Sequence, residues 1–159
     1  MKCKNKSVFY VLITLFAVGI MGIAAGCEQQ KTEYQIDPSK LVSEVLETVH
    51  FASEMQELDK DSLAITYTIE ENTEVIAYMA GGALSDEIIV FTSPDESTAK
   101  KMLDHVKAHI EERSELFADY APAEVVKLEK AYTLQKGKYV VVCVTDDISN
   151  AKTIINKHF

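Results

Sequence analysis

Residues 139–144 read Tyr-Val-Val-Val-Cys-Val and are apolar at every position. β-Branched residues favour a strand, and an unbroken apolar strand indicates that both faces of its sheet are covered. The turn signal Gln-Lys-Gly-Lys precedes it at 135–138, and residues 131–134 supply a partner strand. This end of the chain therefore predicts a hairpin at the centre of a sheet.

A second hairpin is predicted upstream, from residues 75–80 and 87–92 on either side of a turn that contains Gly81 and Gly82. Ser93 then resembles a helix N-cap, because Pro94 and Glu96 follow it at the spacing of a capping box. Apolar residues recur at helical spacing from there to about residue 119. A long helix is thus expected between the hairpins, followed by a short helix at about 122–130.

Helices are also predicted at both ends of this region. Asp37 can cap a helix with Pro38 at its first position, and that helix is expected to end near Ser53. Asp146 or Asp147 can cap a final helix. Residues 54–72 fit either a short helix or an extended segment. The pattern predicts one α+β domain over residues 37–159, with a mainly antiparallel sheet of four strands and a long central helix.

The first 27 residues have the pattern of a bacterial lipoprotein signal. Three lysines within the first six residues precede an apolar run at 8–23, and Ala24-Ala25-Gly26-Cys27 ends it. We expect cleavage before Cys27, acylation of Cys27 and a polar tether at 27–36. An uncleaved anchor is the alternative, although the run is short for a membrane span.

Removal of residues 1–26 leaves 13 basic and 25 acidic side chains, a formal charge of −12. Such a chain repels phosphates, so nucleic acid is not expected as a partner. Cys143 is then the one cysteine besides Cys27, and its apolar neighbours predict a buried thiol rather than a reactive one.

His105 and His109 lie one turn apart in the predicted long helix, with Glu112 on the next turn. Two imidazoles and a carboxylate at that spacing can bind a divalent metal. The His-Glu-x-x-His pattern of zinc hydrolases is absent from the sequence, and a helical wheel places all three about 80–140° from the apolar stripe. A solvated flank is the favoured interpretation, and no metal site is predicted.

Arg113 lies only about 40° from the centre of that stripe. A covered guanidinium requires a carboxylate or carbonyl partner, for which Glu87 and Glu124 are candidates. We therefore expect Arg113 to be mostly buried in an ion pair. Recognition of an anionic ligand is the alternative, with Arg113, Glu87 and Tyr120 as candidate binding or structural residues.

Phosphate-binding glycine loops and the Gly-x-Ser-x-Gly elbow are absent from the sequence. No catalytic residue or cofactor is predicted. The order of features is a lipobox, Asp86 to Phe91 before a long helix, Arg113 within it, Tyr120 to Glu124 after it and Gly137 to Val140. As a set, this order resembles the domain-of-unknown-function family four-three-five-eight of low-GC Gram-positive bacteria. The resemblance implies an exported lipoprotein and carries no activity or ligand with it.

The sequence favours a non-enzymatic binding domain, anchored to the outer face of the cytoplasmic membrane, whose partner is an envelope protein or a small solute. The alternative is an envelope hydrolase or metal-dependent enzyme that uses His105, His109 and nearby acids. A receptor that feeds a transporter fits less well, because the usual two-lobed form needs a longer chain.

Overall fold

A computed structural model describes residues 33–159; the expected signal at 1–26, Cys27 and the first part of the tether lie outside the described residues. Five strands form a single antiparallel sheet in the order β1-β2-β3-β5-β4. Their bounds are Met55–Leu58 (β1), Glu74–Ala80 (β2), Glu87–Thr92 (β3), Tyr132–Lys136 (β4) and Tyr139–Val144 (β5). Both predicted hairpins are present, as β2 with β3 and β4 with β5.

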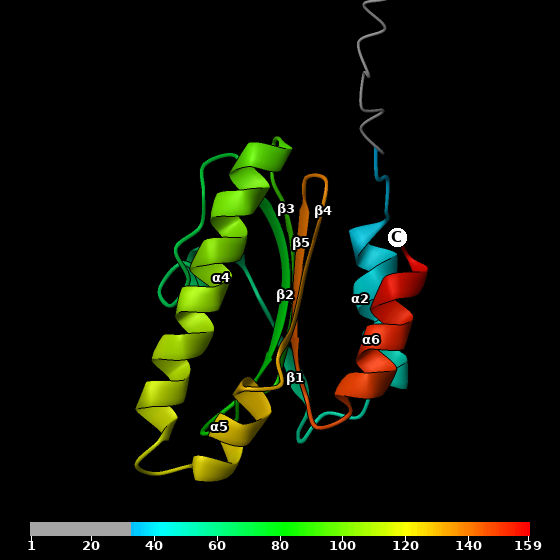
Figure 1. Ribbon diagram of the computed structural model, residues 1–159. Coiled ribbons are helices and arrows are strands. Elements are labelled where there is room, and N and C mark those ends of the chain that lie inside the picture. The colour runs from blue at the N-terminus through cyan, green and yellow to red at the C-terminus, as the bar shows by residue number, and fades with distance from the viewer. Residues whose placement is uncertain (1–32) are drawn as a thin grey trace, which may run out of the picture. The chain divides into compact units, whose positions relative to one another are not determined.

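Helices cover both faces of the sheet, as Figure 1 shows. Helices α2 (Pro38–Thr48) and α6 (Ile148–Lys157) pack on one face, and α4 (Glu96–Phe117) and α5 (Pro122–Leu128) pack on the other. A short helix, α3 (Lys60–Leu63), follows β1. The α+β class, the antiparallel sheet and the long central helix are confirmed. None of the described helices is long and apolar enough to cross a membrane.

Strand β5 explains why the sheet can be covered on two sides. Val140, Val142 and Val144 face α4, whereas Val141 and Cys143 face α2 and α6. Every residue of β5 is buried, so its successive side chains supply both apolar cores by the two-residue period of a strand. The prediction that both faces are covered is confirmed.

The prediction of four strands is wrong, because β1 adds a fifth. Residues 54–72 contain both an extended segment, β1, and a short helix, α3. The sequence of β1, Met-Gln-Glu-Leu, has no clear alternation, and its strand geometry depends on pairing with β2 about 20 residues away. A local pattern cannot report such a long-range contact.

Two local details also differ from the predictions. The long helix is capped by Asp95, whose side chain accepts from the Thr98 amide at 2.8 Å, and not by Ser93. Ser93 instead pairs its backbone N–H with the Lys138 carbonyl, as part of the sheet end. The first helix ends at Thr48 rather than near residue 53.

The sheet has two ends with different surroundings. At one, which we call the Tyr34 end, the rings of Tyr34 and Tyr139 each lie against Phe159. At the other, the Glu87 end, Glu87 pairs with Val144 across β3 and β5. Strand β5 connects the two ends, and six residues span about 20 Å.

Candidate functional site

The first polar cluster at the Glu87 end is centred on Glu87, the first residue of β3. Its carboxylate accepts hydrogen bonds from Arg113 Nη1 at 2.7 Å and from the Tyr67 hydroxyl at 2.8 Å. Glu87 is fully buried, and the Arg113 side chain is 13% exposed. Arg113 also donates to the carbonyl of Leu84 at 3.1 Å. The predicted pairing of Arg113 with a carboxylate is therefore present, and α4 is tied by it to the turn between β2 and β3.

Burial controls the protonation of this cluster. It raises the pKa of the Glu87 carboxyl, while the Arg113 charge and the Tyr67 hydroxyl oppose that shift. Burial and the adjacent Glu87 charge raise the pKa of Tyr67 well above its ordinary value. Tyr67 is thus a hydrogen-bond donor at neutral pH, and the Arg113 guanidinium lies in direct contact with the Glu87 carboxyl.

A second cluster is centred on Lys127, which α5 places beside the sheet end. Its ammonium lies 2.6 Å from Asp86 Oδ2 and 3.2 Å from Glu124 Oε2. Glu124 also accepts from the Ser85 amide at 2.7 Å and from the Ser85 hydroxyl at 2.6 Å. Burial opposes the charge of Lys127, but hydrogen bonds to Asp86 and Glu124 raise its pKa above the usual value. Lys127 stays charged and joins α5 to the start of β3.

Asp86 connects this cluster to the segment between α2 and β1, residues 49–54. Its other carboxylate oxygen accepts from the Ala52 amide at 3.1 Å. Within the same segment, the His50 carbonyl accepts from the Thr145 hydroxyl at 2.5 Å, and the His50 amide lies 3.4 Å from Asp147 Oδ2. Three polar side chains therefore hold the backbone of this segment: Asp86 just before β3, Thr145 just after β5 and Asp147 at the start of α6.

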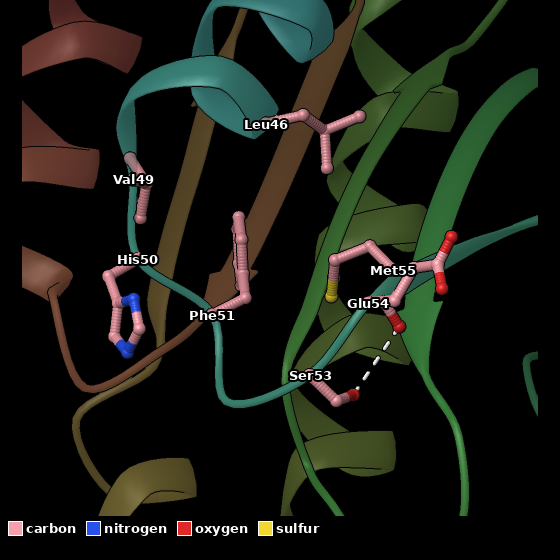
Figure 2. Close-up of a pocket in the computed structure, with 7 residues that line it drawn as sticks. All are labelled: Leu46, Val49, His50, Phe51, Ser53, Glu54 and Met55. Carbon is pink, nitrogen blue, oxygen red and sulfur yellow. Dashed lines mark hydrogen bonds between the residues drawn. The ribbon is translucent and has the colours of Figure 1, made fainter.

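That segment lines a pocket of about 320 Å³, shown in Figure 2. The lining side chains come from the end of α2, the segment 49–54 and the start of β1: Leu46, Val49, His50, Phe51, Ser53, Glu54 and Met55. In the close-up, the Phe51 ring stands between Val49 on one side and Met55 on the other. The volume is at the lower end of the range for small-ligand sites, and four of the seven lining side chains are apolar.

Exposed apolar side chains gather where α4 turns into α5, at the same end of the sheet. Leu116 is 69% exposed and Tyr120 63% exposed, and Val126 on α5 is also exposed. The Tyr120 ring packs against Phe117 with centroids 5.3 Å apart, and Phe117 lies under the Arg113 guanidinium. Tyr120 is thus near Arg113 through Phe117 and does not join the Glu87 cluster.

The expectation that His109 lies on a solvated flank is wrong. His109 is only 6% exposed, because the segment after α3 covers that side of α4: Tyr67 stacks on its ring, and its Nδ1 donates to the Thr66 carbonyl at 3.0 Å. Burial and the nearby Arg113 charge lower the pKa of His109 to about 4. His105 instead contacts Glu70 at 2.9 Å.

The two histidines therefore have separate partners. Among residues 33–159, no group of three or more His, Cys, Asp or Glu side chains is arranged to hold a metal ion. Cys143 is a free, buried thiol on the α2 face of β5, and burial raises its pKa. Its environment is the apolar one that its neighbours in the sequence indicated.

Sequence reasoning missed Lys127, Asp86 and the pocket. Lys127 shares the buried i, i+3, i+4 face of α5 with Glu124 and Leu128, but only the structure shows which face of this short helix is covered. Asp86 and Glu87 are adjacent carboxylates at the start of an apolar strand. Two charges at such a position indicate that each has a polar partner in the fold. The pocket has no such signal, since residues 49–55 come together only when β1 joins the sheet.

The chain matches the family described as "Domain of unknown function (DUF4358)" over residues 47–145. This stretch includes the pocket segment, all five strands, α4 and α5. The protein belongs to this family. Neither the curated proteins nor the solved structures contain a significant match.

Proposed function

We propose that the protein is a lipid-anchored, extracytoplasmic and non-enzymatic binding domain that presents the Glu87 end of its sheet to another envelope component. The observation that carries the proposal is positional. The pocket, the exposed apolar side chains of Leu116, Tyr120 and Val126 and both polar clusters lie at the Glu87 end, whereas the described chain begins at the Tyr34 end.

Acylation of Cys27 would distinguish the two ends of the sheet by their distance from the membrane. Only a few residues separate Cys27 from Tyr34, so in this proposal the anchor joins the domain at its Tyr34 end. The Glu87 end then lies about 20 Å farther out, the length of β5. A partner protein or solute in the envelope reaches that end without meeting the lipid surface.

The polar clusters support binding rather than catalysis. Glu87, Arg113 and Lys127 each contact an oppositely charged group, and their contacts hold the turn before β3 and the pocket segment in place. A catalytic acid or base has to reach substrate, whereas Glu87 is completely enclosed. The role that fits these residues is to hold the binding surface at the Glu87 end in place.

The enzyme alternative, which uses His105 and His109, has less support. His109 Nδ1 is engaged by a backbone carbonyl and its ring is stacked on Tyr67, while His105 contacts Glu70. The two side chains do not converge on one position with a third ligand, which a hydrolytic metal site requires.

Photo-crosslinking in the cells that express the protein tests this proposal. A photoreactive amino acid replaces Ser53 beside the pocket or Leu116 on α4, and matched controls replace Lys138 or Ser97 near the Tyr34 end. All four positions are exposed. We expect a discrete crosslinked product from Ser53 or Leu116 and none from the two controls.

Crosslinking confined to Lys138 and Ser97, or absent from all four positions, would contradict the proposal. A crosslinked small solute that is too light to shift the protein on a gel is detected by a parallel measurement. Mass spectrometry of the irradiated protein then detects the adduct as an added mass at Ser53 or Leu116.

A further inference from the structure

The free edge of the sheet at β1 suggests how a partner is recognised, an inference that rests on the proposed function. Within the described chain β1 pairs with β2 alone, at the outer position of the five-stranded order. Alternate backbone N–H and C=O groups of an edge strand point away from the sheet. Along β1 these groups can pair with one more extended strand.

The pocket is continuous with this edge. Met55 is both a lining residue and the first residue of β1. In Figure 2 the ribbon passes from Phe51 through Ser53 directly into β1. Successive side chains of a strand point to opposite faces, so one side chain of an added strand lies over the pocket on the α2 face. Strand pairing and side-chain insertion are thus available together.

Charge at this edge favours a basic partner. Glu54 and Glu57 are exposed along β1 and the segment before it, and no Lys or Arg lines the pocket. Lys60, the nearest basic residue after β1, donates to the Thr73 carbonyl at 2.8 Å. An acidic strand would therefore meet two uncompensated carboxylates, whereas a basic one would pair with them.

The opposite edge, β4, lacks this combination. Its Tyr132 is covered by Lys152 and hydrogen-bonds Asn156 on α6. Its own Lys136 packs over Tyr34, and none of its residues lines the pocket. A lysine on an edge strand is a common means of preventing strand addition.

We propose that an extended segment of a partner protein pairs with β1, inserts one apolar side chain into the pocket lined by Phe51 and Met55, and places basic side chains against Glu54 and Glu57. Backbone pairing supplies a register, and the pocket and the carboxylates supply the selectivity.

The probe that tests this inference is an eight-residue peptide, blocked at both ends, in which every second residue is in turn valine and lysine and the residues between are threonine, so that valine and lysine lie on the face shared by Met55 and Glu57. It is added to the full-length protein in detergent. Hydrogen–deuterium exchange should slow in residues 53–58 when the peptide binds. A second peptide carries N-methyl groups on alternate amides, which removes donors without changing side chains. We expect it to bind at least about tenfold more weakly, the equivalent of one or two net hydrogen bonds.

Substitutions distinguish the contribution of the pocket to peptide binding from the contribution of the carboxylates. Ser53→Trp fills the pocket from an exposed position and should abolish peptide binding, whereas Ser97→Trp, at the other end of the sheet, should not. Glu54→Lys should weaken binding of the basic peptide, whereas Glu111→Lys on the outer face of α4 should leave it unchanged. The same peptide with glutamate in place of lysine should bind more weakly than the basic peptide.

Equal binding of the methylated and unmethylated peptides, or slowed exchange that leaves residues 53–58 unaffected, would overturn the inference. No binding of the basic peptide would do the same. If crosslinks from Ser53 or Leu116 persist in that case, only the strand-pairing inference fails and the proposed function stands. If the crosslinks from Ser53 and Leu116 are absent as well, both the strand-pairing inference and the proposed function fail.

Discussion

Arg113 and Glu87 show how a buried charge limits what can be changed in this protein. Glu87 is fully enclosed, so its charge is compensated only by Arg113 and by the Tyr67 hydroxyl. A buried ion pair adds little net stability compared with an apolar pair, but removal of one partner leaves the other charge unpaired. The pair is therefore a strong constraint on the position of α4 over the turn before β3.

We expect Arg113→Ala to lower the free energy of unfolding by about 3–5 kcal/mol, the scale for breaking a buried pair. Chemical denaturation measures the loss, and Lys107→Ala on the exposed face of α4 is the control, with a change within about 0.5 kcal/mol. The double variant Arg113→Ala, Glu87→Gln should lose less than the sum of its single variants. A small loss with abolished ligand binding would instead assign Arg113 to recognition.

His109 makes stability depend on pH. Its pKa of about 4 in the folded chain lies below its usual value of 6.5. Between these values the unfolded chain binds a proton that the folded chain does not, so stability is lost as the pH falls. The Glu87 carboxyl makes stability depend on pH in the opposite direction, because folding raises its pKa.

Comparison with His109→Gln isolates the histidine contribution, since Glu87 is present in both proteins. Relative to that variant, the wild type should lose about 3 kcal/mol of unfolding free energy between pH 7.5 and pH 4. Denaturant titrations at both pH values provide the measurement. A difference between the two proteins that stays constant with pH would show that His109 is not buried as a neutral ring.

At the scale of elements, sequence patterns predicted what local spacing controls. The apolar run of β5, the two hairpins and the periodicity of α4 each follow from residues close together in the chain. Strand β1 depends on pairing with β2, and the burial of His109 depends on Tyr67, about 40 residues upstream. The pair of Arg113 and Glu87 could be predicted because a helical wheel locates an unusual charge, whereas the pocket needs segments brought together by the fold.

The start of α4 gives a test of this local reasoning. Asp95→Ala removes the side chain that accepts from the Thr98 amide, so it should lower the melting temperature. Ser93→Ala should lower it less, because the Ser93 hydroxyl has no hydrogen-bond partner within residues 33–159. Thermal unfolding followed by circular dichroism compares the two. A larger loss for Ser93→Ala would restore Ser93 as the cap.

At the scale of the whole molecule, the domain is stabilised by two apolar cores on either side of one sheet. Cys143 is buried, and the described histidines are engaged separately. We therefore expect neither a chelator nor a reductant to change the melting midpoint of the full-length protein. A fall of many degrees with chelator would revive a metal site at His105 and His109, because a metal that binds only the folded state adds stability by mass action.

Membrane anchoring at Cys27 is the central claim of the proposal, because it would attach the domain to the membrane at its Tyr34 end and leave the Glu87 end free for a partner. Mass spectrometry of the protein extracted from membranes tests it most directly. The predicted result is a mature chain that begins at Cys27 and carries two or three acyl groups, with Cys27→Ala either accumulating as precursor or released. Recovery of a chain that retains residues 1–26 and an unmodified Cys27 would contradict the claim.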